Sequence, residues 1–233
     1  MAVNWRTPMS TLGWVAAIAL VVATLLTVVL RFNLTGDPPL RAEGADFVDF
    51  VVTRVEWDRD RLPLDLGASL LFAVAFSALA SVGWLLGAAD QDADRGRVIA
   101  AALVVAGILG AAAQLIHVGA ATVASDPTIC DCGYRAEEII GRLQAMHVAD
   151  SQRTWLTHGA FVAGSIGFFL ASGRSSGSSW RGLSIAIGTL LLLAVLVEVI
   201  GLEAVPELVV LATVGLLIPA WAIALARWNQ ATN

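Results

Sequence analysis

Six long apolar stretches alternate with polar segments along the chain. They cover residues 11–30, 66–89, 98–125, 154–173, 182–201 and 208–226. The stretch 98–125 has no Asp, Glu, Lys or Arg in 28 residues, and a helix of this length rises ~1.5 Å per residue and crosses a bilayer. None of the stretches alternates with a period of two, as the strands of a transmembrane barrel do. The pattern predicts an all-α polytopic membrane protein, a six-transmembrane-helix bundle forming a single domain over residues 1–233.

Two longer polar segments, 31–65 and 126–153, follow the first and the third helix. Apolar residues in each recur at helical spacing: Phe47, Val48, Val51, Val52 and Val55 in the first, and Ile139, Ile140, Leu143 and Met146 in the second. Each segment is therefore predicted to be a loop bearing a short amphipathic helix, with the first of these lying on the bilayer surface.

An even number of crossings places both termini on one side of the membrane. The segments 1–10, 90–97, 174–181 and 227–233 have a higher density of Arg than the two long loops. Cytoplasmic segments carry such an excess. We therefore expect cytoplasmic termini in a cell (plasma) membrane, with both long loops outside. The residues Trp14, Trp84, Trp180 and Trp221 would form an aromatic belt at the inner boundary, and Trp155 would lie at the outer one.

Helix–helix contacts are predicted where small residues recur every four positions. One such stripe comprises Ser69, Ala73, Ser77 and Ser81, and another comprises Gly159, Ala163 and Gly167. Pro219 is expected to kink the last helix, since proline removes a backbone donor.

Composition supports the membrane assignment and narrows the chemistry. The chain is 58% hydrophobic and only 14% charged, and its net charge of −5 is spread over the loops. With no basic patch, a nucleic-acid partner is not indicated. All basic residues are Arg, and the absence of Lys excludes a retinal Schiff base. No nucleophile-elbow, phosphate-loop, zincin or dinucleotide motif occurs, so no enzyme class is indicated.

Five polar residues are predicted to lie at one height in the outer half of the bundle: Asp65, Gln114, His117, His158 and Glu198. Three interpretations remain open. His117, His158 and Glu198 could bind haem or a transition metal, with Gln114 and Asp65 supporting them in an outer shell. Alternatively, these groups relay protons or contact a substrate. In the third interpretation they only make interhelical hydrogen bonds.

Cys130 and Cys132 form a Cys-Asp-Cys sequence in the second long loop. On an extracytoplasmic face two cysteines usually form a disulfide. A disulfide staple, a redox-active pair and a soft-metal site all remain open.

The segments 64–87, 157–175 and 180–196 together resemble six-helix prokaryotic membrane proteins of a domain-of-unknown-function family. This chain has Trp180-Arg181 where that family usually has Pro-Arg. The resemblance implies the six-helix layout and no activity.

The functional expectation is a non-catalytic sensor, accessory subunit or assembly factor. It would use the bilayer as its environment and present its outer loops to a protein partner. One alternative is a metal- or haem-binding redox protein that uses the His and Glu residues. A second alternative is a small-solute transporter.

Overall fold

The computed structural model describes residues 6–32, 47–90, 92–124, 136–173, 178–200 and 209–231. All regular structure in these ranges is helical. The elements are α1 (Arg6–Arg31), α2 (Phe47–Ala88), α3 (Ala93–Ala124), α4 (Ala136–Ala171), α5 (Ser178–Val199), the π-helix η2 (Thr213–Leu217) and α7 (Ile218–Ala231). Six helical segments of the described chain are long and apolar enough to cross a membrane. The number and order of the predicted helices are thus confirmed.

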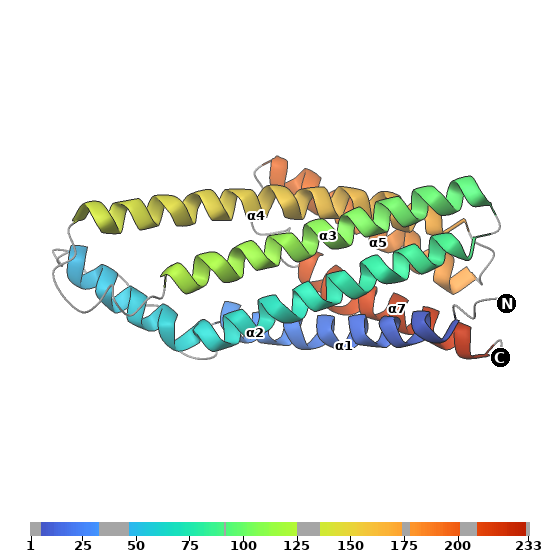
Figure 1. The fold of residues 1–233 in the computed structure, drawn as a ribbon, viewed down its shortest axis with the longest axis horizontal. Coiled ribbons are helices and arrows are strands. Elements are labelled where there is room, and N and C mark those ends of the chain that lie inside the picture. The colour runs from blue at the N-terminus through green and yellow to red at the C-terminus, as the bar shows by residue number, and fades with distance from the viewer. Residues whose placement is uncertain are drawn as a thin grey trace.

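The helices lie side by side along the long axis of the molecule, and both termini lie at one end, which we call the terminal end (Figure 1). Helix α3 packs between α2 and α4, α1 packs between α2 and α7, and α5 contacts α4, η2 and α7. The order of helices around the bundle therefore follows the order of the chain and closes into a ring.

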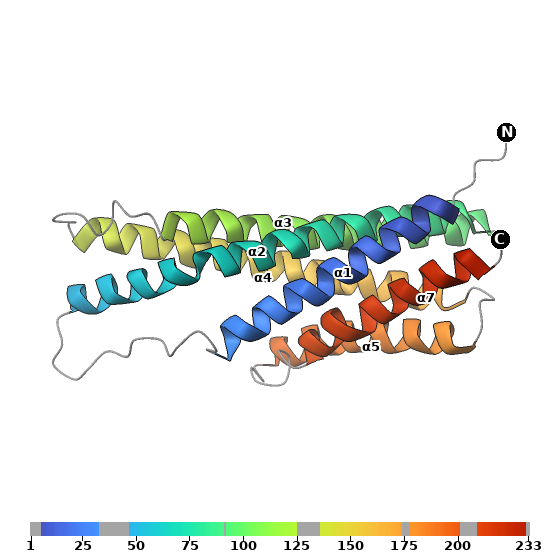
Figure 2. The same cartoon turned by 90° about the horizontal axis from the view of Figure 1, so that it is seen from below.

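Helices α2 and α4 are longer than the sequence pattern predicts. The expected amphipathic helices are not separate elements, because α2 continues without a break from Phe47 and α4 from Ala136. Both helices project past α3 at the far end, opposite the termini (Figures 1 and 2). Helix α2 contains Pro63 and bends along its length (Figure 1), as a helix does where proline removes a backbone donor. We call the projecting parts the α2 and α4 extensions.

Trp221 lies at the centre of the bundle and does not belong to an aromatic belt. Its side chain is 1% exposed, its ring centroid lies 5.0 Å from that of Phe168 and 5.5 Å from that of Trp180, and its indole N–H donates to Ser184 Oγ at 2.9 Å. Burial of this large aromatic surface with its one donor satisfied stabilises the centre of the bundle. The belt prediction for Trp221 was wrong because depth along a helix does not fix the direction of a side chain.

Helices α2 and α3 approach closely because glycine lies at their contacts. A Cβ atom on Gly87 would lie 2.3 Å from the carbonyl oxygen of Gly96, and one on Gly107 would lie 2.5 Å from that of Phe76. Backbone atoms cannot move aside as the end of a side chain can. Only glycine therefore permits this separation.

The small-residue stripe on α4 includes packing contacts as predicted, and the structure shows that the neighbouring helix is α3. A Cβ atom on Gly159 would meet Leu109, and one on Gly167 would meet Leu103. The stripe on α2 is only partly a packing face: Ser69 and Ala73 are buried, whereas Ser77 and Ser81 are exposed. The two exposed hydroxyls donate to backbone carbonyls one turn earlier in α2, which satisfies them without a neighbouring helix.

The predicted disturbance at Pro219 takes the form of a π-helical turn. Directly before this proline, the N–H of Ile218 donates to the carbonyl oxygen of Thr213, five residues back. The wider turn accommodates a residue that cannot donate to the α-helical ladder.

The outer surface of the bundle carries many large apolar side chains. Ile18, Ile108 and Leu216 are 60%, 59% and 69% exposed, and similar residues occur on every long helix. Water-soluble monomers do not expose apolar surface on this scale. Such a surface is typical of helices that contact lipid.

Candidate functional site

A chain of three polar side chains crosses the far end of the bundle from α2 through α3 to α4. His117 Nε2 on α3 lies 2.8 Å from Asp65 Oδ2 on α2, and His117 Nδ1 lies 3.0 Å from Arg153 Nη1 on α4. The His117 side chain is 19% exposed. We call this chain the Asp65–His117–Arg153 bridge.

The partners of His117 determine which ring nitrogen carries the proton. A guanidinium has only donors, so Nδ1 must accept from Arg153. The neutral ring therefore carries its proton on Nε2 and donates it to the Asp65 carboxylate. This arrangement satisfies both ring nitrogens at once, as a histidine in a mostly apolar bundle requires.

Regular helical spacing brings the polar residues to one place. On α4, Met146, Asp150, Arg153 and Thr157 recur every three or four residues, and on α3 Gln114 and His117 do the same. Residues at these spacings share a helix face. Because α3 packs between α2 and α4, these residues lie on the two sides of the bridge along the helix axis. Met146 and Asp150 lie towards the far end, and Gln114 and Thr157 lie towards the bundle interior.

Beyond the bridge, towards the extensions, lies a far-end cavity of about 270 Å³. Its walls include Asp65, His117, Trp57 and Arg61. The guanidinium of Arg61 lies 3.4 Å from the centre of the Trp57 ring, in a cation–π contact. The α2 extension thereby supplies an arginine that is 8% exposed.

Arg153 and Thr157 line a second space of about 180 Å³ inside the bundle, which we call the Arg153 chamber. Its other walls are Thr27, Phe72, Phe76, Gly110, Gln114, Ala160, Phe161, Val210, Leu211 and Val214. Phe76, Phe161 and Val214 also border a void of about 40 Å³ at the bundle centre, next to Trp221. The bridge thus separates a polar cavity at the far end from a largely apolar interior.

His158 and Glu198 form a separate contact between α4 and α5. His158 is five residues beyond Arg153, ~7.5 Å further towards the terminal end. Its Nε2 lies 2.8 Å from Glu198 Oε2, but the direction is not that of a hydrogen bond, and Nε2 is buried without such a partner among the described residues. The Glu198 side chain is 47% exposed, so its carboxylate lies at the surface of the bundle.

The residues expected to bind a metal or haem are therefore brought together in two pairs. Within the described chain, no group of three or more His, Cys, Asp or Glu side chains is placed to hold a metal ion. Both nitrogens of His117 are engaged, so a metal would have to displace Arg153 or Asp65. Gln114 lies on the chamber wall. Cys130 and Cys132 lie outside the described residues.

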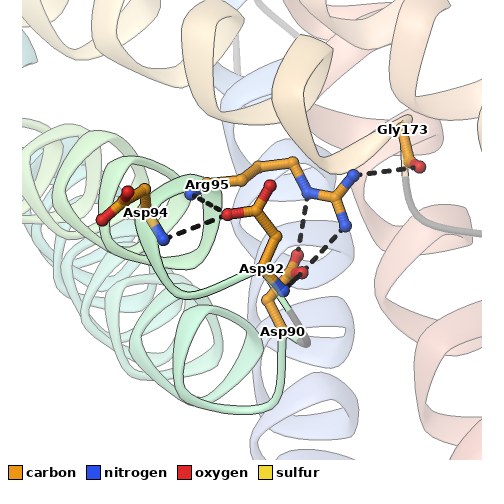
Figure 3. A network of polar contacts seen from close by, with 5 residues as sticks. All are labelled: Asp90, Asp92, Asp94, Arg95 and Gly173. Atoms are coloured by element: carbon orange, nitrogen blue, oxygen red, sulfur yellow. Dashed lines mark hydrogen bonds and ion pairs between the residues drawn. The ribbon is translucent and has the colours of Figure 1, made fainter.

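A polar network at the terminal end fixes the turn between α2 and α3 (Figure 3). Arg95 donates to both carboxylate oxygens of Asp90, at 2.8 and 3.2 Å, and to the carbonyl oxygen of Gly173 at 3.4 Å. Asp92 Oδ1 accepts from the backbone N–H groups of Asp94 and Arg95, which is the capping arrangement for the start of a helix. These contacts join α3 to the end of α4 and line no part of the Arg153 chamber.

Arg153 is the main site residue that the sequence pattern missed. It directly precedes the apolar stretch 154–173, where the hydropathy pattern predicts the end of a loop. The signal that could have identified it is its spacing from Thr157, Ala160 and Phe161, which places it on the inward face of a continued helix.

No protein family, curated protein or solved structure matches the chain.

Proposed function

We propose that the chain is a multi-pass membrane protein that senses a small molecule at its far end and transmits binding to the α2 and α4 extensions. The observation that carries this proposal is the Asp65–His117–Arg153 bridge. It links the two helices that project from the bundle through polar contacts with α3. It also lies between two cavities.

The bridge suits a switching role because its contacts can be exchanged. The Arg153 side chain makes one hydrogen bond within the described chain, and a ligand in the chamber would engage its remaining donors. A ligand shifts a conformational equilibrium when it binds one arrangement better than the other. Releasing Arg153 from His117 would uncouple α4 from α2 at the level where their extensions begin.

In the proposed orientation, the terminal end faces the cytoplasm and the extensions face outside. The Arg density of the short segments supports this orientation, and the exposed apolar surface of the long helices supports membrane insertion. A membrane-impermeant maleimide on intact cells tests it, in a background with Cys130 and Cys132 replaced by serine. We expect Asp60→Cys on the α2 extension to be labelled and Ala88→Cys at the other end to be protected. The reverse pattern would contradict the orientation.

The sensing role is tested by the distance between the extensions. Spin labels at exposed positions Asp60 and Gln144 report on α2 and α4 at the far end, and labels at Ala88 and Ser172 report on the same helices at the terminal end. In lipid nanodiscs, His117→Ala should shift or broaden the far-end distance distribution and leave the terminal-end distribution unchanged. Thr122→Ala is the matched control, because Thr122 is exposed on the same helix and bonds only within it.

The result shows whether the bridge holds the two extensions in position. An unchanged far-end distribution in His117→Ala would contradict the proposal, since it would show that the bridge does not hold the extensions. A change at both ends would also contradict it, because the variant would then have disturbed the whole bundle.

A further inference from the structure

The Arg153 chamber contains hydrogen-bonding groups that the protein itself does not use. The Arg153 side chain makes its one hydrogen bond to His117, and no carboxylate of the described chain lies within ion-pair distance of it. The side-chain amide of Gln114, on the same chamber, has no hydrogen bond within the described chain. Both residues are partly buried and line the chamber. Their unused hydrogen-bonding groups are therefore available to a polar ligand there.

The charge of such a ligand follows from Arg153. A guanidinium within a membrane-spanning bundle is costly without a counter-charge. Asp65 lies on the other side of the imidazole ring and is occupied by His117 Nε2. A bound anion would place a negative charge directly against the guanidinium, which offers paired donors to a planar carboxylate.

The remaining walls define the rest of the ligand. Phe72, Phe76, Phe161 and Val214 provide an apolar surface, which suits a hydrocarbon or aromatic tail. The volume of about 180 Å³ is below the ~300–1,000 Å³ of pockets for drug-sized ligands. Among the described residues, Arg153 is the one charged residue on the chamber wall, so a single carboxylate matches it better than a phosphate dianion.

We propose that the Arg153 chamber binds a small apolar carboxylic acid as its anion, with the carboxylate held by Arg153 and Gln114 and the tail against the phenylalanines. This inference rests on the proposed sensing function and specifies its ligand class. In the bound state the carboxylate would compete with His117 for the guanidinium. That competition would convert occupancy into a change of the bridge.

The test compares hexanoate with hexanamide, a nearly isosteric neutral compound, by isothermal titration calorimetry on protein in nanodiscs of neutral phospholipid. Empty nanodiscs correct for partition into lipid. We expect hexanoate to bind at least tenfold more tightly than hexanamide. Arg153→Gln should reduce hexanoate affinity at least tenfold. Arg97→Gln, which removes the same charge from an exposed site at the terminal end, should leave it unchanged.

A second variant keeps the test decisive if Arg153→Gln does not fold. Gln114→Leu retains the size of the side chain and the charge of the chamber, and it should weaken hexanoate several-fold. Equal affinities for hexanoate and hexanamide, no loss in either variant, or binding no greater than to empty nanodiscs would overturn the inference. The spin-label result with His117→Ala is independent of the ligand. It can therefore support sensing even where the ligand class is wrong.

Discussion

His117 Nδ1 accepts a hydrogen bond from Arg153 Nη1 at 3.0 Å, and this contact joins two helices from residues 36 positions apart in the chain. Because arginine can only donate, the contact fixes the tautomer of the ring and directs its proton to Asp65. The geometry of one residue on α3 thereby couples a carboxylate on α2 to a guanidinium on α4.

The tautomer gives the first prediction. We expect nitrogen-15 NMR of histidine-labelled protein to show His117 as a neutral ring with the proton on Nε2. The His117→Ala variant assigns the signal against those of His147 and His158. In Arg153→Gln the constraint on Nδ1 is weakened, so the tautomer populations should change. A His117 ring protonated on Nδ1 in the wild type would contradict the bridge as described.

The coupling between Asp65 and His117 gives the second prediction. A double-mutant cycle with Asp65→Asn and His117→Ala, measured as unfolding free energies in detergent, should yield an interaction of about 1–2 kcal/mol, within the range for hydrogen bonds between membrane helices. The matched cycle of Asp65→Asn with Thr122→Ala should be additive. Additivity in both cycles would show that the contact contributes no stability.

The close approach of α2 and α3 gives the third prediction. Gly107→Ala should destabilise the protein strongly, because its Cβ would lie 2.5 Å from the Phe76 carbonyl oxygen and 2.6 Å from the Ala80 Cβ atom. Gly119→Ala on the same helix is the control, since a Cβ there meets nothing within 4 Å and alanine is the better helix former by about 1 kcal/mol. Thermal unfolding measures both variants. Equal melting temperatures would contradict the tight α2–α3 contact.

The terminal-end network gives the fourth prediction. Arg95→Gln should lower the melting temperature more than Arg97→Gln does. Arg95 pairs with Asp90, whose side chain is 1% exposed, whereas Arg97 pairs with an Asp94 side chain that is 92% exposed. Loss of Arg95 removes two charge-assisted hydrogen bonds from a buried carboxylate, while an exposed ion pair contributes little. The opposite ranking of the two variants would show that the network is not structural.

Hydropathy predicted the six helices well, since lipid contact requires long apolar runs. It did not predict the length of α2 and α4. Charged residues such as Arg54 and Asp60 lower the hydropathy of this segment to the level typical of a loop. A helix outside the bilayer can nevertheless contain such residues. Continuation of helical spacing through Pro63 was the available signal, but proline more often ends a helix than bends it.

The candidate site could be predicted only in part. Asp65 and His117 were expected at one height, and they are in contact. Which helices are neighbours depends on packing at positions such as Gly87 and Gly107, and the sequence pattern does not specify that. His158 and His117 were therefore grouped as one candidate site, whereas the structure pairs each with a different carboxylate.

A single distance measurement can follow both ligand binding and the state of the bridge. Double electron–electron resonance between spin labels at Asp60 and Gln144, in nanodiscs with and without hexanoate, reports whether chamber occupancy moves the extensions. We predict a hexanoate-dependent shift of this distance that is lost in Arg153→Gln, with no change between labels at Ala88 and Ser172. Calorimetric binding of hexanoate without any shift between the extensions would contradict the sensing function.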